Sequence, residues 1–299
     1  MARAVQSTGY AFTTPTPASH ARVNARSQSA LAQDLAGVFG WSRPFREDVV
    51  PPDILTPMRE AGVLLSDAAG DRSAVRLSSL DGLLFVHSAY PTTAIDSVFF
   101  GPDTYRFARA ILAHLANGAP VRRAVDIGCG AGPGAILVAR ARSNAEVFAV
   151  DINHAALRLT RVNAVLAGVQ VAAVDSDLLS EVTGSFDLIV ANPPYLVDPG
   201  ERAYRHGGGP LGAGLSLAIL GTALERLVPG GTLLLYTGAA IVNGADPFKH
   251  AAAAQLSGTG ASWAYEELDP DVFGEELERG VYASADRIAA VVLTVKKWE

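Results

Sequence analysis

The stretch Val125-Asp126-Ile127-Gly128-Cys129-Gly130-Ala131-Gly132-Pro133-Gly134 decides the fold of this chain. The apolar run 124–127 suits a buried parallel strand. The glycines that follow let the backbone turn sharply and approach a ligand closely. Pro133 suits the first turn of a helix, where free N–H groups face the ligand. We therefore predict a strand, a small-cofactor loop and a helix, in that order.

Two cofactors compete for this loop. Gly130-x-Gly132-x-x-Ala135 fits the dinucleotide pattern, and Asp151 follows about 20 residues later, where an acid meets a ribose hydroxyl. Asp126, however, stands before the glycines at the end of the strand. A carboxylate there can pair with an α-amino group, which S-adenosylmethionine has and NAD lacks. The pattern favours S-adenosylmethionine.

Composition limits the class of protein. The 299 residues can bury a sizeable core, and 49% hydrophobic with 18% charged residues is typical of a globular enzyme. A net charge of −6 disfavours nucleic acid as a partner, because phosphate binding requires a basic face. The single cysteine excludes an internal disulfide and a thiolate zinc site, and the histidines suggest no metal. No apolar run is long enough to span a membrane. We expect a cytoplasmic protein of unknown oligomeric state.

The first hundred residues differ in character from the rest. Residues 1–30 have no acid and are rich in Ser, Thr and Ala, which predicts a flexible leader. Residues 31–98 predict an accessory module that resembles a winged helix: a helical pattern from Ser29, short helices cut by prolines, and a hairpin that turns at Asp81-Gly82. This module lacks a basic cluster, so a lid or dimerisation role is favoured over DNA binding.

Residues 99–299 alternate strands and helices, which is typical of an α/β fold with a doubly wound parallel sheet. A helix at 105–115 is expected to cover the cofactor cleft, and Pro229-Gly230-Gly231 to form a turn after the helix at 214–228. Further helices are predicted at 133–142, 153–167 and 246–256. Seven strands are predicted at 123–127, 146–150, 170–174, 186–191, 232–237, 262–268 and 287–296.

A second motif, Asn192-Pro193-Pro194-Tyr195, follows the predicted strand at 186–191. The lone pair of an amide or exocyclic amine nitrogen is delocalised, so methyl transfer to it depends on positioning. The Asn192 side-chain oxygen and the Pro193 carbonyl can accept hydrogen bonds from the target NH₂ and stabilise its developing charge. Pro194 offers a second carbonyl without a competing N–H, and Tyr195 a face for stacking. The alternative is a strand that ends at prolines without a catalytic role.

Together these residues resemble the class I S-adenosylmethionine-dependent methyltransferases, which have a Rossmann-like sheet. Within that class the chain is similar to the protein-(glutamine-N5) methyltransferases that modify release factors. The resemblance rests on the two motifs, on Pro102-Asp103-Thr104, on Ser176-Asp177-Leu178-Leu179 and on Arg205-His206. The chain departs from that group at Tyr105, where an acid is usual, in the glycine-rich run 207–212, and in the hairpin of its first module.

The resemblance implies roles for individual positions. Asp126, Gly128 and Gly130 would hold the methionine part of the cofactor, Asp151 its ribose and Asp177 its adenine amino group. Thr104, Gly132 and Asn192 are further positions expected at the cofactor. A helix N-cap is the alternative for Asp151, and a surface turn for Asp177.

Charged residues near the second motif are less decisive. Arg202, Arg205 and His206 are candidates for a loop that closes over the substrate, or they are solvated. An acidic run follows near the C-terminus and is expected to be a solvated face. Its members are Glu266, Glu267, Asp269, Asp271, Glu275, Glu276 and Glu278.

The sequence therefore predicts an N-methyltransferase that acts on a planar amide or amine. The best candidate acceptor is an exposed glutamine side chain of a partner protein. An adenine or guanine amino group of RNA or DNA is the first alternative, although a base in a duplex would have to be flipped out. A small metabolite is the second. A cofactor-binding scaffold without turnover is the non-enzyme alternative.

Overall fold

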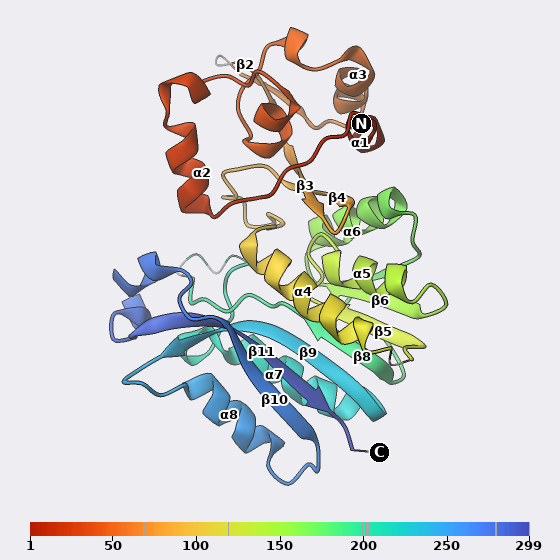
Figure 1. Ribbon diagram of the computed structural model, residues 1–299, viewed down its shortest axis with the longest axis vertical. Coiled ribbons are helices and arrows are strands. Elements are labelled where there is room, and N and C mark those ends of the chain that lie inside the picture. The colour runs from red at the N-terminus through yellow and green to blue at the C-terminus, as the bar shows by residue number, and fades with distance from the viewer. Residues whose placement is uncertain are drawn as a thin grey trace.

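The computed structural model describes residues 1–67, 70–118, 120–198, 200, 202, 204–278 and 280–298. A smaller N-terminal module lies above a larger domain built on one sheet (Figure 1). The module consists of short helices and two hairpins. Its helices are α1 (Ala2–Ser7), α2 (Pro17–Asn24), η1 (Ser27–Ser29), η2 (Ala36–Gly40), η3 (Glu47–Val49) and α3 (Pro52–Glu60). Its strands are β1 (Leu64–Asp67), β2 (Gly70–Ser73), β3 (Val75–Leu80) and β4 (Leu83–Ser88).

Residues 1–30, expected to be a flexible leader, are folded onto this module. Val5 and His20 are fully buried. The Tyr10 hydroxyl donates to the Leu77 carbonyl at 2.9 Å, and the backbone of Phe12 exchanges hydrogen bonds with Ser79 of β3. A composition without acids does not prevent packing, because a few apolar and aromatic side chains are enough to anchor the segment.

The hairpin predicted at Asp81-Gly82 is present. β3 and β4 pair antiparallel up to Leu80 opposite Leu83, and both turn residues have positive φ, as a type I′ turn requires. The helix predicted from Ser29 is instead reduced to the π-helical turn η2. There the Asp34 carboxylate accepts from the Gly37 N–H at 2.7 Å, which offers the backbone an alternative to a regular helix.

The larger domain contains a seven-stranded sheet in the order β10-β11-β9-β8-β5-β6-β7. Its helices are α4 (Pro102–Ala116), α5 (Pro133–Ala141), α6 (His154–Ala167), η4 (Pro210–Gly212), α7 (Gly214–Arg226), α8 (Pro247–Leu256), η5 (Gly274–Glu278) and η6 (Gly280–Tyr282). Its strands are β5 (Arg123–Ile127), β6 (Glu146–Asp151), β7 (Ala172–Asp175), β8 (Phe186–Ala191), β9 (Leu227–Ile241), β10 (Ser262–Asp269) and β11 (Arg287–Lys296). The predicted seven-stranded Rossmann-like sheet is confirmed.

Two details of the sheet differ from the expectation of a parallel sheet with a turn before its fifth strand. β11 runs antiparallel to both β9 and β10. Residues 229–231, expected to form a turn, lie within β9, where the pairing with β8 jumps from Leu227 to Thr232. The turn predicted at 229–231 is therefore an irregularity within the longer strand β9.

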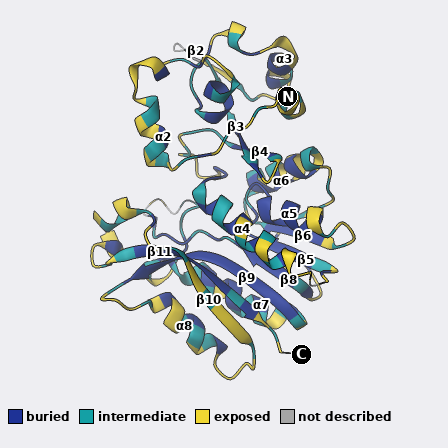
Figure 2. Ribbon diagram, in the orientation of Figure 1, coloured by how far each residue is buried: buried dark blue, intermediate teal, exposed yellow. Residues whose placement is uncertain are grey.

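Helices cover both faces of the sheet. α4, α5 and α6 bury one face around residues such as Ile111 and Ile136, and α7 and α8 bury the other around residues such as Leu220 and Phe248. β5, β8 and β9 are buried, whereas β10 is an exposed edge strand (Figure 2). The carboxyl ends of β5, β6 and β8 therefore open at one edge, where α/β folds place their sites.

The N-terminal module is attached to the sheet domain through α6. Leu159 and Leu166 pack against the core of the module. Asn163 is fully buried, and its amide bonds the N–H and the carbonyl of Val86 and the carbonyl of Ala131, at 2.8 to 2.9 Å. One side chain thus joins β4 of the module to the glycine loop after β5. No helix within the described part of the chain has the length and apolarity to cross a membrane.

Candidate active site

The glycine loop leads from β5 into the N-terminus of α5, as predicted. Gly128, Gly130 and Gly132 all have positive φ, and Pro133 is the first residue of the helix. Asp126 is buried beside this loop and is only 1% exposed. Its carboxylate accepts hydrogen bonds from the Ala135 N–H at 2.9 Å and from the Gly134 N–H. Burial raises its pKa to about 7. A cation placed beside this carboxylate would stabilise its charged form.

Asp151 ends β6 and faces the same loop. Its carboxylate accepts from the Gly130 N–H and from the Asn153 N–H, both at 2.9 Å. Burial raises its pKa. The helix N-cap of α6 is Asn153, whose side chain accepts from the Ala155 N–H, so Asp151 is not the cap itself. The carboxylate is instead tied to the glycine loop, which is compatible with the ribose role implied for it.

Asp177 lies after β7, in a turn where Leu178 has positive φ. Its side chain is exposed, while its neighbour Ser176 is buried. Both residues nevertheless line the same cavity as the glycine loop. Asp177 therefore lies in an exposed turn and also lines the cavity, so the two alternatives do not exclude each other.

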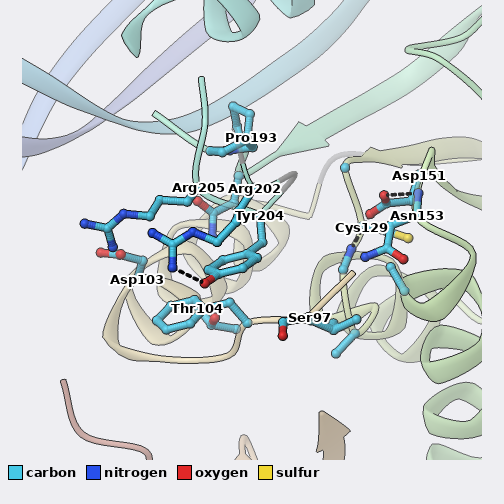
Figure 3. A pocket seen from close by; sticks show the side chains of 18 of the residues that line it. Ser97, Asp103, Thr104, Cys129, Asp151, Asn153, Pro193, Arg202, Tyr204 and Arg205 are labelled. Atoms are coloured by element: carbon cyan, nitrogen blue, oxygen red, sulfur yellow. Dashed lines mark hydrogen bonds between the residues drawn. The ribbon is translucent and has the colours of Figure 1, made fainter. Parts of the chain in front are cut away.

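One cavity of about 390 Å³ joins the two sequence motifs. Figure 3 shows Asp151, Asn153 and Cys129 on one side and Pro193, Arg202, Tyr204 and Arg205 on the other. Gly132 and His206 do not line it: Gly132 is the N-cap of α5, and His206 Nδ1 accepts from the Asp198 N–H. The cavity does bring together the remaining candidate residues: Thr104, Asp126, Gly128, Gly130, Asp151, Asp177, Asn192, Pro193, Pro194, Tyr195, Arg202 and Arg205.

The Asn192-to-Tyr195 motif follows β8 directly. Pro193 is buried, and Asn192 is partly exposed in the cavity. Tyr195 differs from the expected free stacking face, because the residue is only 6% exposed. It packs edge-on against Phe273, with ring centroids 5.8 Å apart, and against Gly238, where a Cβ would lie 2.2 Å from the ring. Tyr195 is therefore built into the wall of the cavity.

A glycine-rich loop clamps the backbone of this motif. A Cβ on Gly207 would lie 2.6 Å from the Pro194 carbonyl oxygen, and one on Gly212 would lie 2.1 Å from the Tyr195 carbonyl oxygen. The Leu196 N–H also donates to the Arg205 carbonyl, and the Gly207 N–H to the Leu196 carbonyl. The glycines that set this chain apart from the family pattern thus permit a close approach of two backbones.

The charged loop residues are organised around Asp198, which is 3% exposed. Arg202 donates to both of its oxygens, at 2.8 and 2.5 Å, and Arg205 lies 3.5 Å away. The Asp198 N–H donates to His206 Nδ1 at 3.2 Å. Hydrogen bonds from Arg202 lower the pKa of Asp198 to about 2. Arg202, Arg205 and His206 are therefore partners of Asp198, rather than side chains that stand free in solvent.

Tyr204 connects this loop to the segment between β4 and α4. Its hydroxyl accepts from Arg202 and donates to the Thr92 carbonyl at 2.6 Å. Its ring stacks on Phe99 with centroids 6.3 Å apart. All these residues line the cavity, so the loop forms part of its wall.

Two positions of the Pro-x-Thr segment serve the fold. Thr104 accepts from the Gly101 N–H at 3.2 Å as part of the cap of α4. Tyr105, which stands where the family usually has an acid, accepts at its hydroxyl from the Thr14 N–H at 3.0 Å. Tyr105 thus contacts the N-terminal segment.

The acidic run is not a purely solvated face. Arg205 pairs with Glu276, Arg106 lies 2.5 Å from Asp269, and Arg287 lies 2.9 Å from Glu267. The bases come from other parts of the chain, so the local sequence could not reveal them.

Sequence reasoning also missed residues that shape the cavity. Asp103 accepts from the hydroxyls of Tyr195 and Tyr236, and Asp198 organises the loop. Tyr90 and Pro17 bring the N-terminal module into the cavity wall. A local signal existed only for Asp103, which stands within the Pro-x-Thr segment.

Comparison with known proteins identifies relatives among methyltransferases. Residues 97–241 match the family model of the methyltransferase small domain. The release factor glutamine methyltransferase of Deinococcus radiodurans is 38% identical over 126 residues, which are 38% of this chain and 44% of that protein. The 4-amino-L-phenylalanine/4-methylamino-L-phenylalanine methyltransferase of Streptomyces pristinaespiralis is 32% identical over 152 residues, which are 46% of this chain and 52% of that protein. The chain thus spans about half the length, or less, of these relatives.

A solved structure agrees in fold. The tRNA m1G37 methyltransferase of Methanocaldococcus jannaschii superposes with a TM-score of 0.52 at 16% identity, over 77% of this chain and 59% of that chain. The seven-stranded sheet therefore has the Rossmann-like fold of that structure. The matched region is an S-adenosylmethionine-dependent methyltransferase domain.

Proposed function

We propose that this chain is an N-methyltransferase that transfers the methyl group of S-adenosylmethionine to a planar amide or amine nitrogen. The observation that carries the proposal is the single cavity lined by both Asp126 and Asn192. One side of it has the carboxylates and amides suited to the cofactor, and the other has the oxygen acceptors suited to an NH₂ group. The best candidate acceptor is the side-chain amide of a glutamine in a partner protein.

The residues present fit the cofactor. The Asp126 carboxylate suits an ammonium group, because burial raises its pKa to about 7 and a cation would relieve that cost. Asp151 and Asp177 suit hydroxyl and amino donors as acceptors. The cofactor supplies a methyl group whose bond to sulfur breaks as the acceptor nitrogen forms its bond to carbon, and the nitrogen then loses a proton to water.

Asn192 and the Pro193 carbonyl would hold the acceptor. Both offer oxygen atoms that accept from the two N–H groups of an amide, which aims the nitrogen lone pair at the methyl carbon. Such positioning lowers the barrier of a reaction whose nucleophile is weak. The same contacts would stabilise positive charge on the nitrogen as the bond forms.

A small aromatic amine is a second candidate acceptor. Tyr90, Phe99 and Tyr204 line the cavity, and aromatic rings of this kind favour flat partners. The name of the Streptomyces relative describes an acceptor of that chemistry. A nucleic-acid base has the same amino geometry, but the net charge of −6 does not favour a polyanion.

Transfer of labelled methyl groups from S-adenosylmethionine into three pools tests the proposal. The pools are protein extract, RNA with DNA, and small metabolites, each incubated with the wild type and with Asn192→Ala. Label in a protein band that the variant does not label supports the glutamine candidate, and mass spectrometry of that band then identifies the residue. Label confined to either other pool assigns the acceptor to that class instead. Binding of cofactor without label in any pool would overturn the proposal and favour a scaffold.

A further inference from the structure

Three donors converge on the carboxylate of Asp103, which lines the same cavity as the Asn192-to-Tyr195 motif. The Tyr195 hydroxyl donates to Oδ2 at 2.9 Å. The Tyr236 hydroxyl donates to Oδ1 at 2.7 Å, and Arg106 donates to the same oxygen at 3.2 Å. Asp103, Tyr195 and Tyr236 are all less than a tenth exposed. This cluster joins the first turn of α4, the middle of β9 and the last residue of the motif.

The cluster fixes the end of the motif in space. The Tyr195 ring already lies between Gly238 and Phe273, so its hydroxyl has a single direction in which to point. There it meets a carboxylate, and a hydrogen bond to a charged acceptor is stronger than one between neutral groups. The backbone from Asn192 to Tyr195 is short and contains two prolines, which limit its freedom. Holding Tyr195 therefore limits how far Asn192 can move.

We propose that Asp103 is a positioning residue for methyl transfer, which acts by holding the Tyr195 hydroxyl and thereby the acceptor-binding oxygens of Asn192 and Pro193. This inference rests on the proposed function of the motif. Displacement of a reacting group by about 1 Å can cost about a hundredfold in rate. A residue that keeps those two oxygens in place therefore contributes to the rate without touching the nitrogen.

Tyr236 provides a matched control within the same cluster. Its hydroxyl donates to the same carboxylate at a similar distance, and it is fully buried. It belongs to β9 and does not line the cavity, whereas Tyr195 does. Tyr195→Phe and Tyr236→Phe each remove one hydroxyl hydrogen bond to the Asp103 carboxylate, but only the first frees the motif. A purely structural role of the cluster would make the two variants alike.

The experiment measures single-turnover transfer from radiolabelled S-adenosylmethionine into protein extract, at saturating cofactor. We expect Tyr195→Phe to slow transfer by about tenfold or more. We expect Tyr236→Phe to stay within about twofold of the wild type, and both variants to bind cofactor within about twofold of it, since neither hydroxyl touches the glycine loop. Equal rates for the two variants would overturn the proposal.

A double variant tests whether Asp103 acts through Tyr195. If it does, Asp103→Asn combined with Tyr195→Phe is no slower than the slower of the two single variants, because residues in one network are not additive. If the rate losses of Asp103→Asn and Tyr195→Phe multiply in the double variant, Asp103 does not act through Tyr195.

Hydrogen exchange supplies a measurement that needs no activity. Tyr195→Phe should speed amide exchange in residues 195–198 relative to Tyr236→Phe, and equal exchange in the two variants would refute the positioning role. If the wild-type protein transfers label to none of the three acceptor pools, the proposed function is refuted. Hydrogen exchange would still show whether the Tyr195 hydroxyl holds the motif in place.

Discussion

The affinity for S-adenosylmethionine should depend on pH through Asp126. Burial raises the pKa of this carboxyl from 3.8 to about 7 in the ligand-free protein. A bound ammonium group would favour the charged form and lower that pKa again. The cofactor would then bind the ionised state more tightly, and binding would release a proton wherever the free carboxyl is protonated.

The size of the effect follows from the position of this pKa. With a free pKa of about 7 and a bound pKa below about 5, the dissociation constant should rise by about fifteenfold between about pH 7 and about pH 5.5. At the lower pH about one proton should be released for each cofactor bound.

Isothermal titration in two buffers of different ionisation enthalpy measures both quantities. Asp126→Asn cannot ionise and should bind weakly, with an affinity that does not change over this range. A wild-type dissociation constant that stays within about twofold, or an equal slope in the variant, would show that Asp126 does not meet the cation.

The same carboxyl affects the stability of the ligand-free protein with a defined sign. Its folded pKa lies above the unfolded value, so the folded state binds more protons between about pH 4 and 7. Its contribution to the free energy of unfolding is fully present below about pH 4 and lost as pH rises through about 7. The loss is up to about 4 kcal/mol. Denaturant unfolding across this range should show a smaller decline in Asp126→Asn than in the wild type.

Other substitutions test the motif and the loop. Asn192→Ala should lose about a hundredfold or more in transfer rate, measured in single turnovers at saturating cofactor; unchanged turnover would exclude its role. Gly207→Ala should lower the free energy of unfolding by about 1 to 3 kcal/mol, because its Cβ would lie 2.6 Å from the Pro194 carbonyl oxygen. Gly274→Ala, with nothing within 4 Å, is the matched control, and equal denaturation midpoints would contradict the clamp. Asp198→Asn should cost about 1 to 3 kcal/mol in chemical unfolding, because two arginines lose their buried partner. That contribution of Asp198 is present above its unfolded pKa and is lost as pH falls through about 2. A variant as stable as the wild type at neutral pH would refute this account of the loop.

The core of the sheet could be predicted closely from the sequence. The strands expected at 123–127, 186–191 and 287–296 have those bounds in the structure, and the helix after the glycine loop begins at Pro133 as predicted. Such segments carry their own signals, because buried strands are continuous apolar runs and glycine and proline mark where they end. The meeting of the two motifs at one edge followed from the strand direction alone.

The N-terminal region was predicted less well. Its hairpin has a local signal in Asp81-Gly82, but residues 1–30 do not, and they were expected to be flexible. Their order comes from contacts with β3, such as the bond from Tyr10 to Leu77, which spans 67 positions. No local pattern encodes a contact of that range.

The glycine loop, the succession of strands and helices, and the two motifs can be recognised locally, because each depends on residues that are neighbours in the chain. The contacts that hold the motifs in place depend on the folded structure. The bond from Tyr195 to Asp103 spans 92 positions, and the pair of Arg205 with Glu276 spans 71. Periodicity reports which face of an element is buried, but the partner of a polar side chain is chosen by the packing of distant elements.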